Sequence, residues 1–225
     1  MESFSKIQKE AGGTFSSGLA RISHGQGRDI YKRGSIMKRM IVNFLVTLVF
    51  ILLTVYIPIA MSGDPVNLRS QAKRLSDEDV KSMLTKYNFF DRTKNKKGAF
   101  TNDFVDNGDG TVTDRATALM WQKDGSSEGM TWASAKEYIN KLNSGQFGSY
   151  SYWRLPTIEE LASLMKSSRA KGKLYTDSIF SEKQQFCWSA DTFGPEMAWY
   201  ASFKAGMIRH IYHFFYHVRA VRTIK

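Results

Sequence analysis

The feature that most constrains this chain is an apolar run without a single charged residue, which extends from Ile41 to Met61. The run reads IVNFLVTLVFILLTVYIPIAM and is preceded by Lys38 and Arg39. About 20 consecutive apolar residues are enough for a helix to cross the hydrocarbon core of a bilayer. A buried core helix is normally shorter and carries a polar stripe. The run therefore predicts that residues 41–61 contact the membrane.

The segment 37–62 is either a signal peptide that is cleaved or a membrane anchor that is retained. From Met37, the sequence MKRM and the apolar run that follows have the pattern of a secretory signal peptide, and Ala60 and Ser62 supply small residues for cleavage before Gly63. The hydrophobic centre of a signal peptide is shorter, at about 7–15 residues, which fits an uncleaved membrane anchor instead. In both cases the positive-inside rule predicts export of the remaining chain to the periplasmic or extracellular face of the cell envelope.

Residues 1–36 are rich in Gly and Ser and show no hydrophobic periodicity. They are either a disordered basic tail or the product of an over-extended start, with Met37 as the true first residue. The chain has a formal net charge of +11 at pH 7. Its N-terminal basic residues nevertheless lack the aromatic interleaving and the motifs of a nucleic-acid-binding arm. We therefore expect no nucleic-acid partner.

A polar stretch follows at residues 63–99 and predicts a linker interrupted by one helix. Ser76 followed by Asp79 is a helix-capping pair. The apolar residues behind this pair recur with helical spacing: Val80, Met83, Leu84 and Tyr87. We place this helix at about residues 76–88 and expect it to need a packing partner elsewhere in the chain.

The C-terminal part, residues 100–225, has the composition of a folded core. All five tryptophans follow residue 120, and large aromatic side chains dominate the energetics of a core. FVDNGDGTVTD at Phe104–Asp114 predicts two short strands around a turn. A helix is predicted after Thr131, with Trp132, Ala135 and Ile139 among the apolar residues of one face. Another is predicted after Thr157, where Glu160 completes a capping box. Further strands are predicted at 186–190, 198–203, 207–212 and 217–223. Helices within a frame of strands predict an α+β domain.

Few residues of this domain indicate chemistry. The turn within Phe104–Asp114 has glycines at positions 108 and 110, where a calcium loop needs oxygen ligands, so calcium is an open but disfavoured alternative. Cys187 lies between two aromatic residues with no charged neighbour, which is typical of a buried and unreactive thiol. Because Cys187 is the one cysteine, an intramolecular disulfide is ruled out.

The remaining candidates for chemistry are histidines and carboxylates. His210, His213 and His217 have spacings that would suit a metal site on a helix, but their β-branched and aromatic neighbours predict strand, on which the imidazoles would not converge. Asp191 and Glu196 flank a Gly-Pro turn, and a solvated loop explains them more simply than a catalytic carboxylate pair does. We therefore predict no enzyme activity, no catalytic residue, no metal site and no cofactor.

Five phrases occur in a characteristic order along the domain: FVDNGDGTVTDRATALMWQ (104–122), MTWASAKEYINKLN (130–143), YWRLPTIEELASLM (152–165), CWSAD…AWYASFKAG (187–206) and VRAVR (218–222). Together they resemble the C-terminal domain family of the Legionella collagen-like protein, over about residues 100–225. The RLPT-x-E-E phrase is also similar to a helix start in formylglycine-generating enzymes. Both families are associated with C-type-lectin-like folds.

The resemblance implies a C-type-lectin-like α+β domain with two core helices and a twisted antiparallel sheet, here preceded by a single hydrophobic helix. It also implies an exported module, which in the namesake is an adhesin that binds sulfated glycosaminoglycans. The chain departs from these families in four respects. It lacks the paired cysteines of formylglycine-generating enzymes. It also lacks the calcium–sugar motifs of true C-type lectins and the collagen-like repeat of the namesake. Finally, Ala118 stands where the family usually carries Gly, a minor change unless that position needs a positive φ.

Two functions of different class follow as hypotheses. The first is an exported or membrane-tethered bacterial ligand-binding domain, adhesin-like, whose partner is a carbohydrate or a sulfated polyanion. The alternative is a structural, envelope-associated domain without a small ligand. Lectin-like folds generally bind ligands on late loops and strands, and alternation along residues 207–217 turns about half of the side chains outward. Unless the helix at 76–88 covers them, the predicted binding residues are Arg209, Tyr212, His213 and Tyr216.

Overall fold

A computed structural model describes residues 37–45, 64–171 and 173–224. The chain divides into two units, residues 1–61 and residues 62–225. In the first unit, residues 37–45 form a helix. The predicted tail at 1–36, and all of the apolar run beyond residue 45, lie outside the described residues. Across the described ranges, no helix is both long and apolar enough to cross a bilayer.

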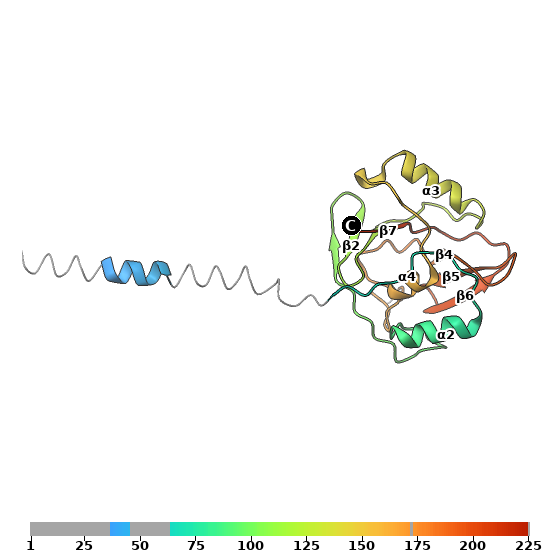
Figure 1. The fold of residues 1–225 in the computed structure, drawn as a ribbon, viewed down its shortest axis with the longest axis horizontal. Coiled ribbons are helices and arrows are strands. Elements are labelled where there is room, and N and C mark those ends of the chain that lie inside the picture. The colour runs from blue at the N-terminus through green and yellow to red at the C-terminus, as the bar shows by residue number, and fades with distance from the viewer. Residues whose placement is uncertain (1–36, 46–63, 172, 225) are drawn as a thin grey trace, which may run out of the picture. The chain divides into compact units, whose positions relative to one another are not determined.

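The second unit is built on two antiparallel sheets (Figure 1). One sheet has the strand order β1-β2-β3-β7 and the other has the order β4-β5-β6. The prediction of one sheet is corrected to two, because the last strand returns to β3, with Trp121 opposite Val221, and does not extend the second sheet. The strands are β1 (Phe104–Asp106), β2 (Thr111–Asp114), β3 (Leu119–Gln122), β4 (Phe186–Thr192), β5 (Ala198–Ser202), β6 (Met207–Ile211) and β7 (Val221–Thr223).

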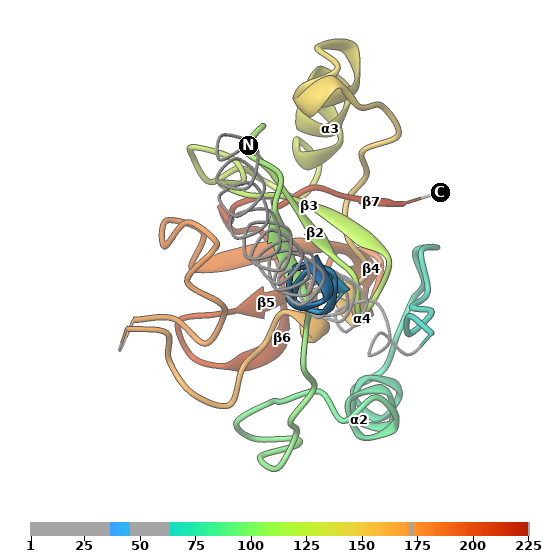
Figure 2. The same cartoon turned by 90° about the vertical axis from the view of Figure 1, so that its left-hand side faces the viewer.

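Three α-helices accompany these sheets: α2 (Asp77–Lys86), α3 (Ala135–Ser144) and α4 (Ile158–Ser163). A short 3-10 helix, η2 (Phe147–Ser149), follows α3. The helices α2 and α3 lie at opposite ends of this unit, and the view turned by 90° shows the same arrangement (Figures 1 and 2). The predicted capping box of α2 is confirmed, since Ser76 Oγ accepts from the backbone N–H of Asp79 at 3.2 Å. Helix α2 packs against α4, which supplies the partner that its apolar face needs.

Helix α3 begins later than predicted. Thr131 Oγ1 accepts a hydrogen bond from the N–H of Ser134 at 3.2 Å, which holds residues 131–134 in a turn. The helix proper starts at Ala135, with Ala135 and Ile139 buried. Trp132 therefore lies on the turn and not on the buried face of the helix.

The RLPT-x-E-E phrase starts α4 and forms a buried polar network. Thr157 caps the helix by accepting from the N–H of Glu160 at 3.2 Å. The Glu160 carboxylate is fully buried and accepts hydrogen bonds from both terminal nitrogens of Arg154, at 2.7 and 2.5 Å. A buried carboxylate is tolerated when it is paired and hydrogen-bonded in this way. The phrase thus has a structural role in the fold.

The hydrophobic core consists of two clusters. One joins α2 and α4 to the strands through side chains such as Val80, Leu161 and Trp199. The other joins α3 to the strands through Trp153, Trp188 and Tyr216, among others. Of the five tryptophans, four are buried and Trp132 is partly exposed. The prediction that the tryptophans build the core is confirmed for those four.

Residues 64–75, whose polar composition predicts a linker, are bonded into the domain. Arg69 donates through its backbone N–H to the Glu159 carboxylate at 2.8 Å, and its guanidinium forms two hydrogen bonds of 2.8 Å with Asp191. Asp191 also accepts from the backbone N–H groups of Lys73 at 2.6 Å and Ile158 at 2.7 Å. The interpretation of Asp191 as a solvated loop residue is therefore wrong. Its carboxylate is fully buried because partners distant in the sequence surround it.

Ala118 lies in the turn between β2 and β3 with a φ of 52°. This is the left-handed region, which a residue with a Cβ occupies at a cost and which Gly occupies readily. The position at which the resemblance implies Gly therefore does need a positive φ, and this chain carries Ala there.

Candidate functional site

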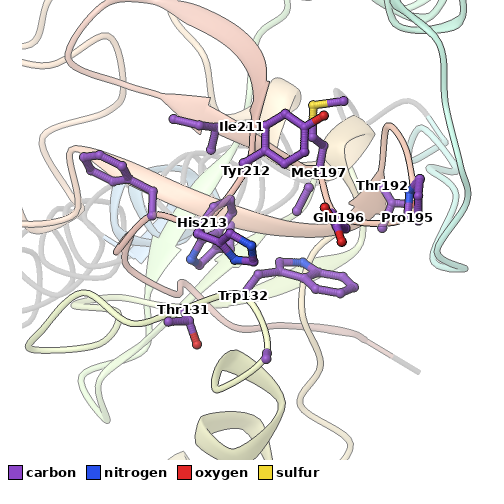
Figure 3. A pocket seen from close by; sticks show the side chains of 13 residues that line it. Thr131, Trp132, Thr192, Pro195, Glu196, Met197, Ile211, Tyr212 and His213 are labelled. Carbon is purple, nitrogen blue, oxygen red and sulfur yellow. The ribbon is translucent and has the colours of Figure 1, made fainter.

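A hollow of about 340 Å³ opens on the surface of the second unit (Figure 3). Three segments that are distant in the sequence form its wall: the turn before α3, the connection between β4 and β5, and the loop after β6. We call it the aromatic hollow, after the aromatic side chains of its lining: Trp132, Trp188, Tyr212, His213 and Phe214. A volume in this range suits a small ligand or part of a larger one.

Two tryptophans of the aromatic hollow are fixed by hydrogen bonds. The indole N–H of Trp132 donates to the carbonyl of Ser189 at 2.7 Å, and that of Trp188 donates to the carbonyl of Met130 at 2.8 Å. Trp188 is buried, whereas Trp132 is partly exposed. The rings are therefore positioned before any ligand arrives.

Glu196 supplies the carboxylate of the aromatic hollow. It follows Pro195 in the β4–β5 connection and is exposed. In Figure 3 its carboxylate lies, in projection, between the rings of Trp132 and Tyr212. Among the described residues that line the hollow, Glu196 alone carries a formal charge at pH 7 with histidine neutral. A ligand in the hollow thus meets aromatic faces and one negative charge.

The structure separates the four predicted binding residues into two pairs. Tyr212, 54% exposed, and His213, also exposed, both line the aromatic hollow. They do so because β6 ends at Ile211 and the following residues form an open loop.

Arg209 and Tyr216 lie elsewhere. The Arg209 guanidinium donates to Thr93 Oγ1 at 3.2 Å and to the carbonyl of Ile208 at 3.0 Å, and Arg209 does not line the aromatic hollow. Tyr216 is only 6% exposed and stacks on Phe186 with ring centroids 5.0 Å apart. Its placement on an exposed surface is therefore corrected. Strand alternation does not continue through the loop, and the chain re-enters the core at Tyr216.

The predicted cover by the helix at 76–88 is found on part of this region. His210 Nε2 lies 3.4 Å from the carboxylate of Asp77, the first residue of α2. The His210 ring also stacks on Phe193 with a centroid distance of 3.8 Å. Helix α2 thus reaches β6 at His210, while Tyr212 and His213 stay exposed beyond the end of the strand.

A second hollow of about 400 Å³ lies beside the first, and Trp132 and Thr192 line both. We call it the basic hollow because Lys73, Arg74 and Lys136 line it as well. All three basic residues are exposed, and none forms an ion pair with any part of the chain that the structure describes. Lys136 Nζ lies 5.7 Å from the centroid of the Trp132 ring.

The basic hollow depends on the segment 64–75. The backbone N–H of Thr192 donates to the carbonyl of Lys73 at 3.0 Å, and Leu75 donates to the carbonyl of Thr192 at 2.8 Å. Arg74 Nε donates to the carbonyl of Phe193 at 3.3 Å. Lys73 and Arg74 are thereby held beside the end of β4, next to the site.

The other candidates for chemistry have ordinary structural roles. The prediction that Cys187 is buried is confirmed, and burial raises the pKa of its thiol to about 11. In the turn considered for calcium, Asp106 pairs with Lys123 at 2.6 Å, and Asp109 accepts from Thr111 Oγ1 at 2.6 Å. Within the described ranges, no group of three or more His, Cys, Asp or Glu side chains is placed to hold a metal ion.

The fold and the site define a mixed α+β domain with two adjoining surface hollows. In comparison with known families, residues 110–222 match the Lcl C-terminal domain. The match covers slightly more than half of the 225 residues, and the chain belongs to this family. The resemblance seen in the five phrases is thereby confirmed. None of the curated proteins compared with the chain gives a match.

Sequence reasoning missed most of the two hollows. It assigned Trp132 to the buried face of a helix and Glu196 to a solvated loop, and it singled out none of Lys73, Arg74 and Lys136. Trp132 gave no local signal, because its spacing to Ala135 and Ile139 is that of a helix face. The basic residues gave no signal, because two of them lie about 60 residues from Lys136 in the sequence.

Proposed function

We propose that this domain is an exported or membrane-tethered binding module whose ligand is a carbohydrate with anionic groups. The ligand lies on the face formed by the aromatic hollow and the basic hollow. The observation that carries the proposal is Trp132, the one partly exposed tryptophan of the described domain, which lines both hollows. We also propose that the two-sheet α+β arrangement is a variant of the C-type-lectin-like fold.

The chemistry of the two hollows supports a ligand of this kind. Aromatic rings such as those of Trp132 and Tyr212 offer flat faces against which the apolar side of a sugar ring packs. Guanidinium and ammonium groups, as on Arg74 and Lys136, form charge-assisted hydrogen bonds with sulfate and carboxylate groups. The formal net charge of residues 63–225, which is +6 from 24 Lys and Arg against 18 Asp and Glu, further favours the approach of a polyanion.

We propose binding without catalysis. The Cys187 thiol is buried, and the Glu160 and Asp191 carboxylates are bound by guanidinium and backbone donors. A substrate in either hollow therefore has no access to this thiol or to these two carboxylates for nucleophilic attack or proton transfer. Export is supported by the charge-free run at 41–61 behind Lys38 and Arg39.

The test is a titration of the full-length chain, in a non-ionic detergent, with a heparin oligosaccharide, with and without calcium. In one variant Lys73, Arg74 and Lys136 are replaced by Gln. A matched control replaces three other exposed basic residues: Lys96, Lys97 and Arg115. Both variants lose three positive charges. We expect the first to weaken binding by at least about tenfold and the control by much less. Equal losses in both variants would reduce the proposal to non-specific charge attraction.

The alternative, a structural envelope domain without a small ligand, also has one observation in its favour. Four tryptophans are buried, as is most of the RLPT-x-E-E phrase: Trp121, Trp153, Trp188 and Trp199. They therefore maintain the fold whatever the surface does. If neither heparin nor a panel of neutral and acidic glycans binds to the correctly folded chain, this alternative replaces our proposal.

A further inference from the structure

The aromatic hollow has a charge of opposite sign to the chain around it. Residues 63–225 hold 24 Lys and Arg against 18 Asp and Glu, a formal net charge of +6, yet the one formally charged residue among the described residues of the lining is Glu196. No Lys or Arg belongs to the described lining; those side chains gather in the basic hollow on the other side of Trp132. An anion is repelled by Glu196, so the two hollows favour groups of different charge.

We infer that the aromatic hollow binds a small organic cation of the quaternary ammonium class. The inference rests on the proposed function only in taking this face as the ligand-binding face, and it does not require that a glycan bind there. A cation over the face of Trp, Tyr or Phe is attracted by the negative face of the ring, and quaternary ammonium ligands are typically held by several such rings. Trp132, Tyr212 and Phe214 provide these rings, and Glu196 adds a carboxylate.

The surface of the lining favours a quaternary over a primary ammonium. A primary ammonium presents three N–H donors, each of which needs an acceptor when water is removed. A quaternary ammonium presents only methyl or methylene groups and therefore suits apolar walls. Besides the rings, Met197, Ala198 and Ile211 form such walls in this hollow.

Exposed aromatic side chains around the hollow support the presence of a ligand. Tyr212 is 54% exposed and Phe214 is 50% exposed, although both belong to residue types that are normally more buried. Phe215, beside them in the loop, is 68% exposed. Contiguous exposed apolar surface of this kind marks binding sites. Because Glu196 is negatively charged, the ligand that fits the aromatic hollow best is a cation.

The test compares choline with 3,3-dimethylbutan-1-ol, its neutral isostere in which carbon replaces the quaternary nitrogen. Both are titrated calorimetrically into the full-length chain in a maltoside detergent, which carries no choline group. Because the two probes share their shape, a difference in affinity reports the charge alone. We expect saturable binding of choline, and binding of the isostere weaker by at least about tenfold. Absence of choline binding, or equal binding of both probes, would overturn the inference.

Three variants locate the choline site. Glu196→Gln removes the charge at constant size and is expected to weaken choline binding by about fivefold, with no effect on the isostere. Tyr212→Leu keeps an apolar wall but removes the aromatic face, and is expected to have an effect of similar size. Glu137→Gln, at an exposed carboxylate of α3 that does not line the hollow, is the matched control and should change nothing. If Glu196→Gln and Glu137→Gln behave alike, the cation does not bind at this site.

The outcome is distinguishable from that of the glycan proposal. Replacing Lys73, Arg74 and Lys136 by Gln should weaken heparin binding and leave choline binding intact or slightly stronger. Choline binding without heparin binding would refute the anionic-glycan proposal and support this inference. Heparin binding that depends on the basic hollow, without choline binding, would support the anionic-glycan proposal and refute this inference.

Discussion

Replacing the buried carboxylate of Asp191 is the sharpest test of how this domain holds together. Asp191 accepts four hydrogen bonds: two from the Arg69 guanidinium at 2.8 Å, one from the N–H of Lys73 at 2.6 Å and one from the N–H of Ile158 at 2.7 Å. It therefore ties the segment 64–75, the start of α4 and the end of β4 together. Asp191→Asn keeps the size of the side chain but removes its charge and one of its acceptors.

The expected cost follows from the burial of the pair. The Asp191 side chain is fully buried and that of Arg69 is 16% exposed, so the guanidinium loses its closest ion-pair partner in a place that water reaches poorly and keeps Glu159, at 3.9 Å. Removing one member of a buried ion pair typically costs about 3–5 kcal/mol. Because Arg69 keeps some access to solvent, we expect a loss of about 3 kcal/mol in the free energy of unfolding.

The assay is urea unfolding of the full-length chain followed by tryptophan fluorescence, which reports on the domain because all five tryptophans follow residue 120. The control is Asp103→Asn, at an exposed carboxylate 4.0 Å from Arg115. An exposed pair contributes at most about 1 kcal/mol. The midpoint should fall steeply for Asp191→Asn and hardly for Asp103→Asn, with equal urea slopes. Similar midpoints for the two variants would refute our reasoning about the anchor.

Three further predictions concern stability and use the same unfolding assay. Ala118→Gly should stabilise the domain by about 0.5–1 kcal/mol, because it relieves a φ of 52°; a destabilisation would contradict that account of the turn. Trp153→Ala should cost about 3–5 kcal/mol, since the side chain is 2% exposed, and parental stability would place it outside the core. Burial opposes the ionisation of Asp91, but hydrogen bonds from Ile208, Lys94 and Thr93 outweigh it and lower its pKa. The contribution of Asp91 to the free energy of unfolding should therefore be present above about pH 4 and be lost as the pH falls further. Asp91→Asn should flatten the dependence of stability on pH in that range; an unchanged dependence would exclude Asp91 as its source.

The parts of the fold that were predictable depend on local interactions. The capping boxes at Ser76 and Thr157 join residues only three positions apart, so the sequence pattern contains both partners. The strands around the turn at 107–110 are likewise set by short-range alternation and by the turn residues. Such features can be predicted from the sequence because tertiary packing has little influence on them.

The site was less predictable because it depends on contacts between distant segments. Asp191 has no local sign of burial, and its main partner, Arg69, is distant in the sequence. The alternation that predicted an exposed Tyr216 holds only while the strand continues, and β6 ends at Ile211. Trp132 has helical spacing to residues of α3, yet it lies in the preceding turn. Where an element ends therefore decided which side chains reach the surface.

The most direct test of the account is to observe Trp132 while a ligand binds. The full-length chain is labelled with 5-fluorotryptophan, and its five fluorine resonances are assigned by replacing each tryptophan in turn with Phe. A heparin oligosaccharide is then added to saturation. We predict a large shift of the Trp132 resonance, since its ring lines both hollows, and little change for the buried Trp121. A saturating ligand that leaves Trp132 unchanged would show that this face is not the binding site.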